Sequence, residues 1–131
     1  MNSLEQLQPA IVAKLKGDGT LMGMVTGVFD DVPRGQKFPF IQVGSATETP
    51  RNTFGRKGRE ATITLDIFSR YNGFKEALQI YSRVDELLDG EPLTLQSYHL
   101  VFLQNDGMNT ILGPDGITRH IPVRYRAFVQ E

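Results

Sequence analysis

The sequence predicts an α+β domain in which two principal helices pack on one face of a mainly antiparallel β-sheet. Two segments place apolar residues at the spacing of an amphipathic helix, one near the start of the chain and one in its middle. Other segments alternate apolar and polar residues, as half-buried strands do. These strands follow one another at hairpin-like spacing and do not alternate strictly with helices, so we expect mainly antiparallel pairing.

The composition is that of one folded domain. With 131 residues, 40% apolar and 22% charged, the chain can bury a core, and we expect one domain over residues 1–131. The 14 basic and 15 acidic residues give a net charge of −1, which argues against a dedicated nucleic-acid binder. The lack of cysteine excludes disulfides, thiolate metal sites and cysteine nucleophiles. Without a secretory leader or about 20 successive apolar residues, we expect a soluble cytoplasmic product with no membrane span.

The first helix is predicted near the start of the chain. Ser3 is a candidate N-cap and Gly17 a terminator. Pro9 indicates either a kink or a helix that effectively starts near Pro9. The apolar positions at helical spacing are Leu4, Leu7, Ile11, Val12 and Leu15.

Two strands are expected before the middle of the chain. A glycine-punctuated segment predicts a turn and a short strand around Val28–Asp30. The sequence KFPFIQVGSATET then predicts a longer strand, with Ile41 and Val43 on one face. Phe40 and Gln42 lie on its other face.

The segment Thr49–Gly58 is basic and rich in glycine, has no apolar periodicity, and is expected to be an irregular loop. A clean strand follows it, in which apolar residues alternate with Thr62, Thr64, Asp66 and Phe68. The apolar residues are Ala61, Ile63, Leu65 and Ile67.

The second helix is the best-defined element of the sequence. Asn72 is the expected N-cap, and Gly90 and Pro92 end the helix. The predicted apolar face comprises Phe74, Ala77, Leu78, Tyr81, Val84, Leu87 and Leu88.

Two last strands, over residues 98–106 and 118–131, are separated by a turn at Gly113–Gly116. In the final strand one face is apolar, whereas His120, Arg124 and Arg126 lie on a solvated or partner-facing side. The apolar face consists of Ile121, Val123, Tyr125, Ala127 and Val129.

The motifs that could carry catalysis or ligand binding are weak. The sequence FGRKGRE resembles a phosphate loop in composition, but Lys57 lacks the flanking residues of that motif and a strand follows it. His99 and His120 have no ligand spacing around them. Ser69 lacks the glycines of a nucleophile elbow. We therefore predict no catalytic residue, no cofactor and no metal site.

The basic segment is predicted to contact a partner. Its cations surround one aromatic residue, an arrangement that suits a contact segment which orders against another protein. A mobile connection that contacts nothing is the alternative, and contact with a nucleic-acid backbone is a third possibility. The candidate contact residues are Arg51, Phe54, Arg56, Lys57 and Arg59.

Several short motifs occur in a defined order along nearly the whole chain. They are DDVP at Asp30–Pro33, FPFIQVG at Phe38–Gly44 followed by Thr47 and Glu48, Gly55 and Gly58, IFSR at Ile67–Arg70 followed by Gly73, Glu76 and Ala77, and GPDGITRH at Gly113–His120 followed by VRYRA. This series resembles the tail completion proteins, or tail terminators, of long non-contractile-tailed phages, prophages and gene-transfer particles. Phe68 stands where that family often has tryptophan, and it preserves an aromatic ring.

The resemblance implies a structural virion protein without enzymatic activity. It implies a homohexameric ring at the head-proximal end of the tail, assembled in the host cytoplasm. Such a ring stops polymerisation of the tail tube protein and joins a head-completion or connector protein, while double-stranded DNA passes through the lumen without specific binding.

Two alternatives to a tail terminator remain open from the sequence. One is a head–tail connector or stopper ring. The other is a small carboxylate-dependent enzyme that uses Asp30, Asp31 and Asp66, with Glu48 as a further candidate acid or base. The enzyme requires a polar pocket in which these carboxylates converge.

Overall fold

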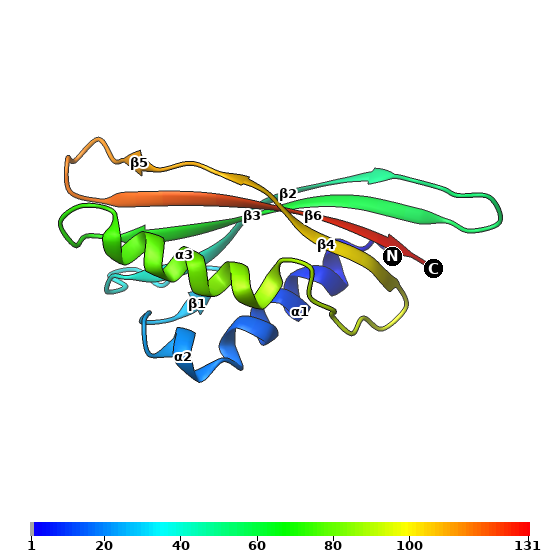
Figure 1. Ribbon diagram of the computed structural model, residues 1–131, viewed down its shortest axis with the longest axis horizontal. Coiled ribbons are helices and arrows are strands. Elements are labelled where there is room, and N and C mark those ends of the chain that lie inside the picture. The colour runs from blue at the N-terminus through cyan, green and yellow to red at the C-terminus, as the bar shows by residue number, and fades with distance from the viewer. Residues whose placement is uncertain (1) are drawn as a thin grey trace.

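In the computed structural model, which describes residues 2–131, three helices cover one face of a six-stranded sheet (Figure 1). All strand pairs are antiparallel except the first, so the predicted α+β class and the mainly antiparallel sheet are confirmed. The strand order is β1 (Val28–Phe29), β2 (Phe40–Pro50), β3 (Gly58–Ser69), β6 (Arg119–Gln130) and β4 (His99–Met108), and β5 (Ile111–Leu112) also pairs with β6.

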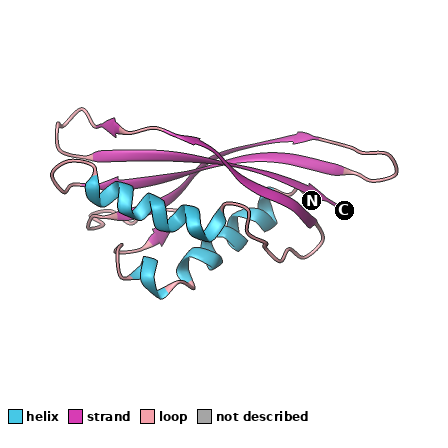
Figure 2. Cartoon of the chain, viewed as in Figure 1, coloured by secondary structure: helices cyan, strands magenta, loops and turns pink. Residues whose placement is uncertain are grey.

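The helices form a single layer under the sheet, and the other face of the sheet has no helix against it among the described residues (Figure 2). The two principal helices, α1 (Leu4–Lys16) and α3 (Lys75–Leu88), match the two that the sequence predicts. A short third helix, α2 (Gly19–Met22), was not predicted. The side chain of Asp18 caps it by accepting a hydrogen bond from the Leu21 N–H at 2.8 Å. No helix in residues 2–131 is long and apolar enough to cross a membrane.

The hydrophobic core lies between the helices and the two central strands. In β3 and β6 every residue predicted to face the core is fully buried. Their neighbours across the layer are Leu7, Ile11 and Leu15 of α1 and Ala77, Ile80, Val84 and Leu88 of α3. Because both central strands have neighbours on both sides, alternation of period two specifies their register.

The start of α1 differs from one expectation. The helix begins at Leu4, ahead of Pro9, so of the two alternatives that Pro9 indicated, a start near Pro9 is wrong. Ser3 precedes the helix as predicted, but its side chain makes no capping bond. Instead, the Ser3 hydroxyl and its backbone N–H, the latter at 2.7 Å, donate to the carboxylate of Glu48 on β2. The tertiary contact to a charged acceptor replaces the local cap.

The start of α3 also differs from the prediction. Its N-cap is Phe74, and Asn72 lies outside the helix because Gly73, with φ +77°, turns the chain between them. Leu78, predicted on the apolar face, is exposed, while Ile80 is buried in its place. The buried positions of α3 recur at intervals of three and four, so the helix turns a narrower face to the core than the sequence pattern indicated.

The basic segment Thr49–Gly58 is more ordered than predicted. β2 continues to Pro50 and β3 begins at Gly58, so only Arg51–Lys57 connects them. The first two residues of the expected loop belong to the β2–β3 ladder, where Thr49 pairs with Glu60 and Pro50 with Arg59. Threonine favours extended backbone, which explains why β2 persists after its apolar run ends. In Figure 1 this hairpin extends beyond the helix layer.

Candidate assembly surface: the arm and the outer face of the sheet

The connection between β2 and β3, residues 51–57, is here called the arm. Its tip is a tight turn in which Thr53 and Arg56 exchange two backbone hydrogen bonds of 2.9 and 3.0 Å. Gly55 occupies the third position of this turn with φ +81°, a conformation that favours glycine. The second position therefore falls to Phe54, whose side chain is completely exposed, with a relative accessibility of 108%.

The arm is held by contacts to the chain around it. The amide of Asn52 accepts a hydrogen bond from the Gly58 N–H at 3.2 Å. The side chain of Gln130, at the end of β6, donates to the Thr53 hydroxyl at 3.0 Å. The Lys57 carbonyl accepts from the Glu131 N–H at 3.0 Å. These bonds tie the turn to the last residues of β6, so the exposed ring of Phe54 stands on an ordered support.

The predicted contact cations occupy three different environments. Arg51 turns back onto the sheet, where it pairs with Glu60 at 3.3 Å and lies 4.3 Å above the ring centre of Phe128. Arg59 lies on the helix-covered face and pairs with Glu48 at 3.4 Å. These two arginines already have partners within the chain.

Arg56 and Lys57 are the free charges of the arm. Both are exposed, and neither forms an ion pair within residues 2–131. The guanidinium of Arg56 makes only a long contact of 3.5 Å with the Gln130 side chain. The arm therefore presents one apolar ring beside two unpaired positive charges.

The outer face of the sheet, opposite the helices, carries an aromatic and ionic cluster. His120 lies 2.6 Å from Asp66 and stacks on Phe68, with ring centres 4.6 Å apart. The ring of Phe40 packs beside Phe68 at 5.2 Å. Part of the polar face predicted for the last strand therefore has its partners within the sheet itself, since His120 contacts the Asp66 carboxylate.

The carboxylates proposed for an enzyme do not converge. Asp30 borders a hollow between α1 and Val43, on the helix-covered side. Asp66 lies on the outer face with His120. Within residues 2–131 no group of three or more His, Cys, Asp or Glu side chains is placed to hold a metal ion. The pocket that the carboxylate enzyme requires is therefore not built from these residues.

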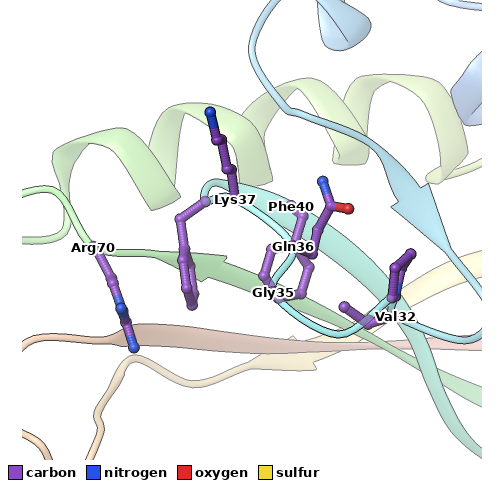
Figure 3. Close-up of a pocket in the computed structure, with 8 residues that line it drawn as sticks. Val32, Gly35, Gln36, Lys37, Phe40 and Arg70 are labelled. Atoms are coloured by element: carbon purple, nitrogen blue, oxygen red, sulfur yellow. The ribbon is translucent and has the colours of Figure 1, made fainter.

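A broad, open hollow lies where the loop before β2 meets the end of β3 (Figure 3). Its lining consists of residues 32, 33, 35–38 and 40 together with Arg70. Arg70 is fixed there, 4.4 Å from the ring centre of Phe38 and 3.8 Å from Asp115. The lining contains neither a carboxylate nor a histidine, so it offers no acid–base pair.

Two carboxylates accept several hydrogen bonds, one in the helix layer and one at the β5–β6 turn. Hydrogen bonds from the guanidinium of Arg83 and the Leu21 N–H lower the pKa of Asp18 to about 2. At the β5–β6 turn the Thr118 hydroxyl and backbone N–H groups lower the pKa of Asp115 to about 2. Both groups organise the chain locally, one at the start of α2 and the other before β6.

The sequence did not point to two further surfaces. One is the free edge of β4, where Val101 is 45% exposed because a bulge between Leu100 and Phe102 breaks the alternation. The other is the β5–β6 end, where Ile111, Leu112 and Ile117 are exposed. Neither surface has a recognisable sequence motif. The one local signal was the apolar pair Ile111–Leu112, which forms β5.

The comparisons with known proteins agree with this architecture. The model of one protein family, described as tail completion protein gp17, matches residues 9–130. The chain belongs to this family. It is a family of structural phage tail proteins, which confirms the resemblance that the ordered motifs indicated.

Individual relatives cover nearly the whole chain. Tail completion protein gp17 of Bacillus phage SPP1 is 28% identical over 120 residues, which cover 92% of this chain and 89% of that protein. The solved structure of the SPP1 gp17 protein superposes with a TM-score of 0.62 at 26% identity, covering 92% of this chain and 86% of that one. A chain of the virion of a native gene transfer agent particle shares the fold, with a TM-score of 0.90 at 24% identity, covering 97% of this chain and 96% of that one.

Proposed function

We propose that this tail completion protein is a tail terminator. It forms a hexameric ring on the head-proximal end of the tail tube, stops the tube from growing, and offers the surface that the head connector joins. Membership of the tail completion family over residues 9–130 carries the proposal. The similarity of the fold to a chain in a gene transfer agent virion supports a position in an assembled particle.

The size of the subunit favours a ring of several copies. A folded chain of 131 residues has a radius of gyration of about 14 Å, too small to surround a DNA duplex by itself. A closed ring requires heterologous contacts, in which one surface of a subunit meets a different surface of its neighbour. The arm at one end of the sheet and the free edge of β4 are two unlike surfaces of this kind.

The arm is the proposed assembly element. Phe54, Arg56 and Lys57 are its contact residues, since their side chains are exposed and the two charges are unpaired. Arg51 and Arg59 hold the base of the arm against Glu60 and Glu48. An aromatic ring beside cations is typical of residues that dominate binding energy at protein interfaces.

We further propose that duplex DNA passes through the ring without specific binding. The net charge is −1, and cations such as Arg126 on the outer face lie near a carboxylate, here Glu60 at 3.6 Å. Phosphate binding needs unpaired cations and is strongly dependent on salt. Tight, salt-dependent binding of duplex DNA by the purified protein would argue against this part of the proposal.

The experiment for the proposed function is deletion of the gene in a particle-producing strain, followed by negative-stain imaging of the tails. A terminator predicts overlong tails of variable length that fail to join heads. Tails of normal length without heads would indicate a connector or stopper ring instead. Normal, infectious particles would contradict a role in completing the tail.

A further inference from the structure

We infer that the arm of one subunit binds the free edge of β4 on a second copy of this chain. The receiving site is a hollow lined by residues 90–92 and 100–104, here called the edge hollow. The inference rests on the proposed ring, and it specifies which two unlike surfaces meet in that ring.

The edge hollow lies on the last strand of the sheet. The segment after α3 covers part of this edge, since the Gly90 N–H donates to the Leu103 carbonyl at 2.7 Å and Asp89 accepts from the Asn105 N–H at 2.8 Å. Among the described residues, no strand lies beside residues 99–102 on that side. An uncovered strand edge is a site at which another chain can pair or dock.

The edge hollow is large enough for an aromatic ring, and apolar side chains form part of its mixed lining. Its volume is about 210 Å³, and its lining includes Pro92, Leu100 and the half-exposed Val101. An apolar cavity of about 150 Å³ is sufficient for a benzene ring. Phe54 is the fully exposed aromatic side chain on the arm, so it is the group that we place in the hollow.

The charges around the two surfaces are complementary. Glu91 lines the edge hollow, and Asp89 precedes it; both are exposed, and neither forms an ion pair within residues 2–131. The arm carries Arg56 and Lys57, also unpaired. Opposite charges beside an apolar contact select the partner and fix its orientation.

The open hollow of Figure 3 does not fit the arm. It also has apolar walls, but the charged residues in its lining are Lys37 and Arg70, which have the same sign as the arm. Like charges would oppose docking of Arg56 and Lys57 there. Of these two hollows, the edge hollow is the one whose charge matches the arm, because its lining places the unpaired Glu91 beside Pro92, Leu100 and Val101.

The test uses thiol-specific cross-linking in completed particles, because the chain has no cysteine of its own. A Thr53→Cys/Val101→Cys variant places one thiol on the arm and one in the edge hollow, and it leaves Phe54 and the charges intact. A short bis-maleimide should then give a ladder of covalent oligomers on a denaturing gel. The matched control is Thr53→Cys/Ile111→Cys, since Ile111 is 42% exposed against 45% for Val101.

A second measurement reverses the charges. In otherwise unmodified particles, Arg56→Glu/Lys57→Glu should reduce the fraction of completed tails by about fivefold or more, as expected when two opposite-charge contacts become like-charge ones. Adding Glu91→Lys should restore a large part of that fraction, while adding Lys14→Glu, on α1, should not.

These results distinguish the inference from the proposed function. Completed particles without a Val101 ladder, or with an equal ladder from the Ile111 control, would overturn the contact between the arm and the edge hollow. A terminator role would survive such a result, because the arm would then contact the tail tube or the connector. If deletion of the gene leaves tails of normal length, the terminator role fails regardless of the cross-links.

Discussion

The two halves of the β2–β3 hairpin share one pair of strands but have opposite surroundings. The half near Leu65 and Ile67 is here called the covered half. Helices lie against one of its faces, β6 flanks it, and these two inward side chains are fully buried. At the arm the same two strands extend past the helices (Figure 1), and the side chain of Phe54 is fully exposed.

This contrast separates the residues that stabilise the fold from those available for assembly. The covered half gains free energy by removing apolar surface from water, roughly 25 cal/mol for each Å². The arm gains none of this, because Phe54 and the unpaired Arg56 and Lys57 contribute little within the monomer. An aromatic side chain that is exposed in the monomer and can be buried in a complex suits a protein that acts by joining others.

Substitution in the covered half should have the largest effect on stability. Leu65→Ala removes a fully buried side chain from the centre of β3, and the cavity left behind cannot collapse between two flanking strands. The free energy of unfolding should fall by about 2–5 kcal/mol, measured by urea denaturation. The neighbouring Thr64→Ala, on the outer face, is the control and should cost less than about 1 kcal/mol. Equal losses for the two variants would contradict the assignment of faces.

Substitution at the junction between the halves should have an intermediate effect. A Cβ at Gly58 would lie 2.3 Å from the Arg51 carbonyl oxygen and 2.9 Å from the Phe128 ring, so the base of the arm must shift. Gly58→Ala should therefore lower the free energy of unfolding by about 1–3 kcal/mol. NMR chemical shifts should change along residues 51–57.

The control for the junction is Gly19→Ala. A Cβ there meets no atom within 4 Å, and the residue begins a helix, so this variant should match or slightly exceed the wild type in stability. If Gly58→Ala left the free energy of unfolding as little changed as Gly19→Ala does, that result would contradict the tight packing at the base of the arm.

A smaller effect is expected from an ion pair in the helix layer, as a function of pH. The pKa of Asp18 is held at about 2 by Arg83, below its ordinary value of 3.8. Between these two values the unfolded chain binds more protons than the folded one, so this contribution to stability is present above about pH 4 and is lost towards pH 2. Asp18→Asn should make the acid-induced loss of stability shallower.

The pH measurement needs the wild type, Asp18→Asn and a control compared by urea denaturation from pH 2 to pH 5. Asp31→Asn is a suitable control for the loss of one carboxylate, because Asp31 is exposed and forms no ion pair in residues 2–131. An unchanged slope for Asp18→Asn would show that the Arg83 pair does not contribute in solution.

The smallest effect on stability is expected at the tip of the arm. Phe54→Ala removes a fully exposed aromatic ring, so the free energy of unfolding should change by no more than about 0.5 kcal/mol. Thermal and urea denaturation both measure this. A loss of 2 kcal/mol or more, comparable to Leu65→Ala, would mean that the ring packs against the monomer in solution.

The covered half could be predicted from the sequence far better than the arm. Alternation in β3 and β6 identified the apolar inward residues, because a strand with neighbours on both sides has only one register that buries its apolar side chains. The pairing of Pro50 with Arg59 was missed, since it depends on residues across the hairpin and not on local periodicity.

The candidate site was predicted in part. The sequence pointed to a basic segment with Phe54 at its centre, but it could not show that Arg51 and Arg59 turn back to Glu60 and Glu48. Such ion pairs join residues that only the fold brings together. The edge hollow was missed for the same reason, because a bulge exposes Val101 and a loop after α3 supplies Glu91.

The central claim is that the arm acts in assembly and not in folding, and one complementation experiment tests it most directly. A strain that lacks the gene is complemented with Phe54→Ala/Arg56→Ser/Lys57→Ser, with Lys14→Ser/Lys16→Ser as the control for lost charge. The length of tails and the fraction joined to heads are measured by negative-stain imaging. We predict that the arm variant is as stable as the wild type yet leaves overlong tails without heads, whereas the control restores complete particles. Complete particles of normal tail length from the arm variant would contradict the claim.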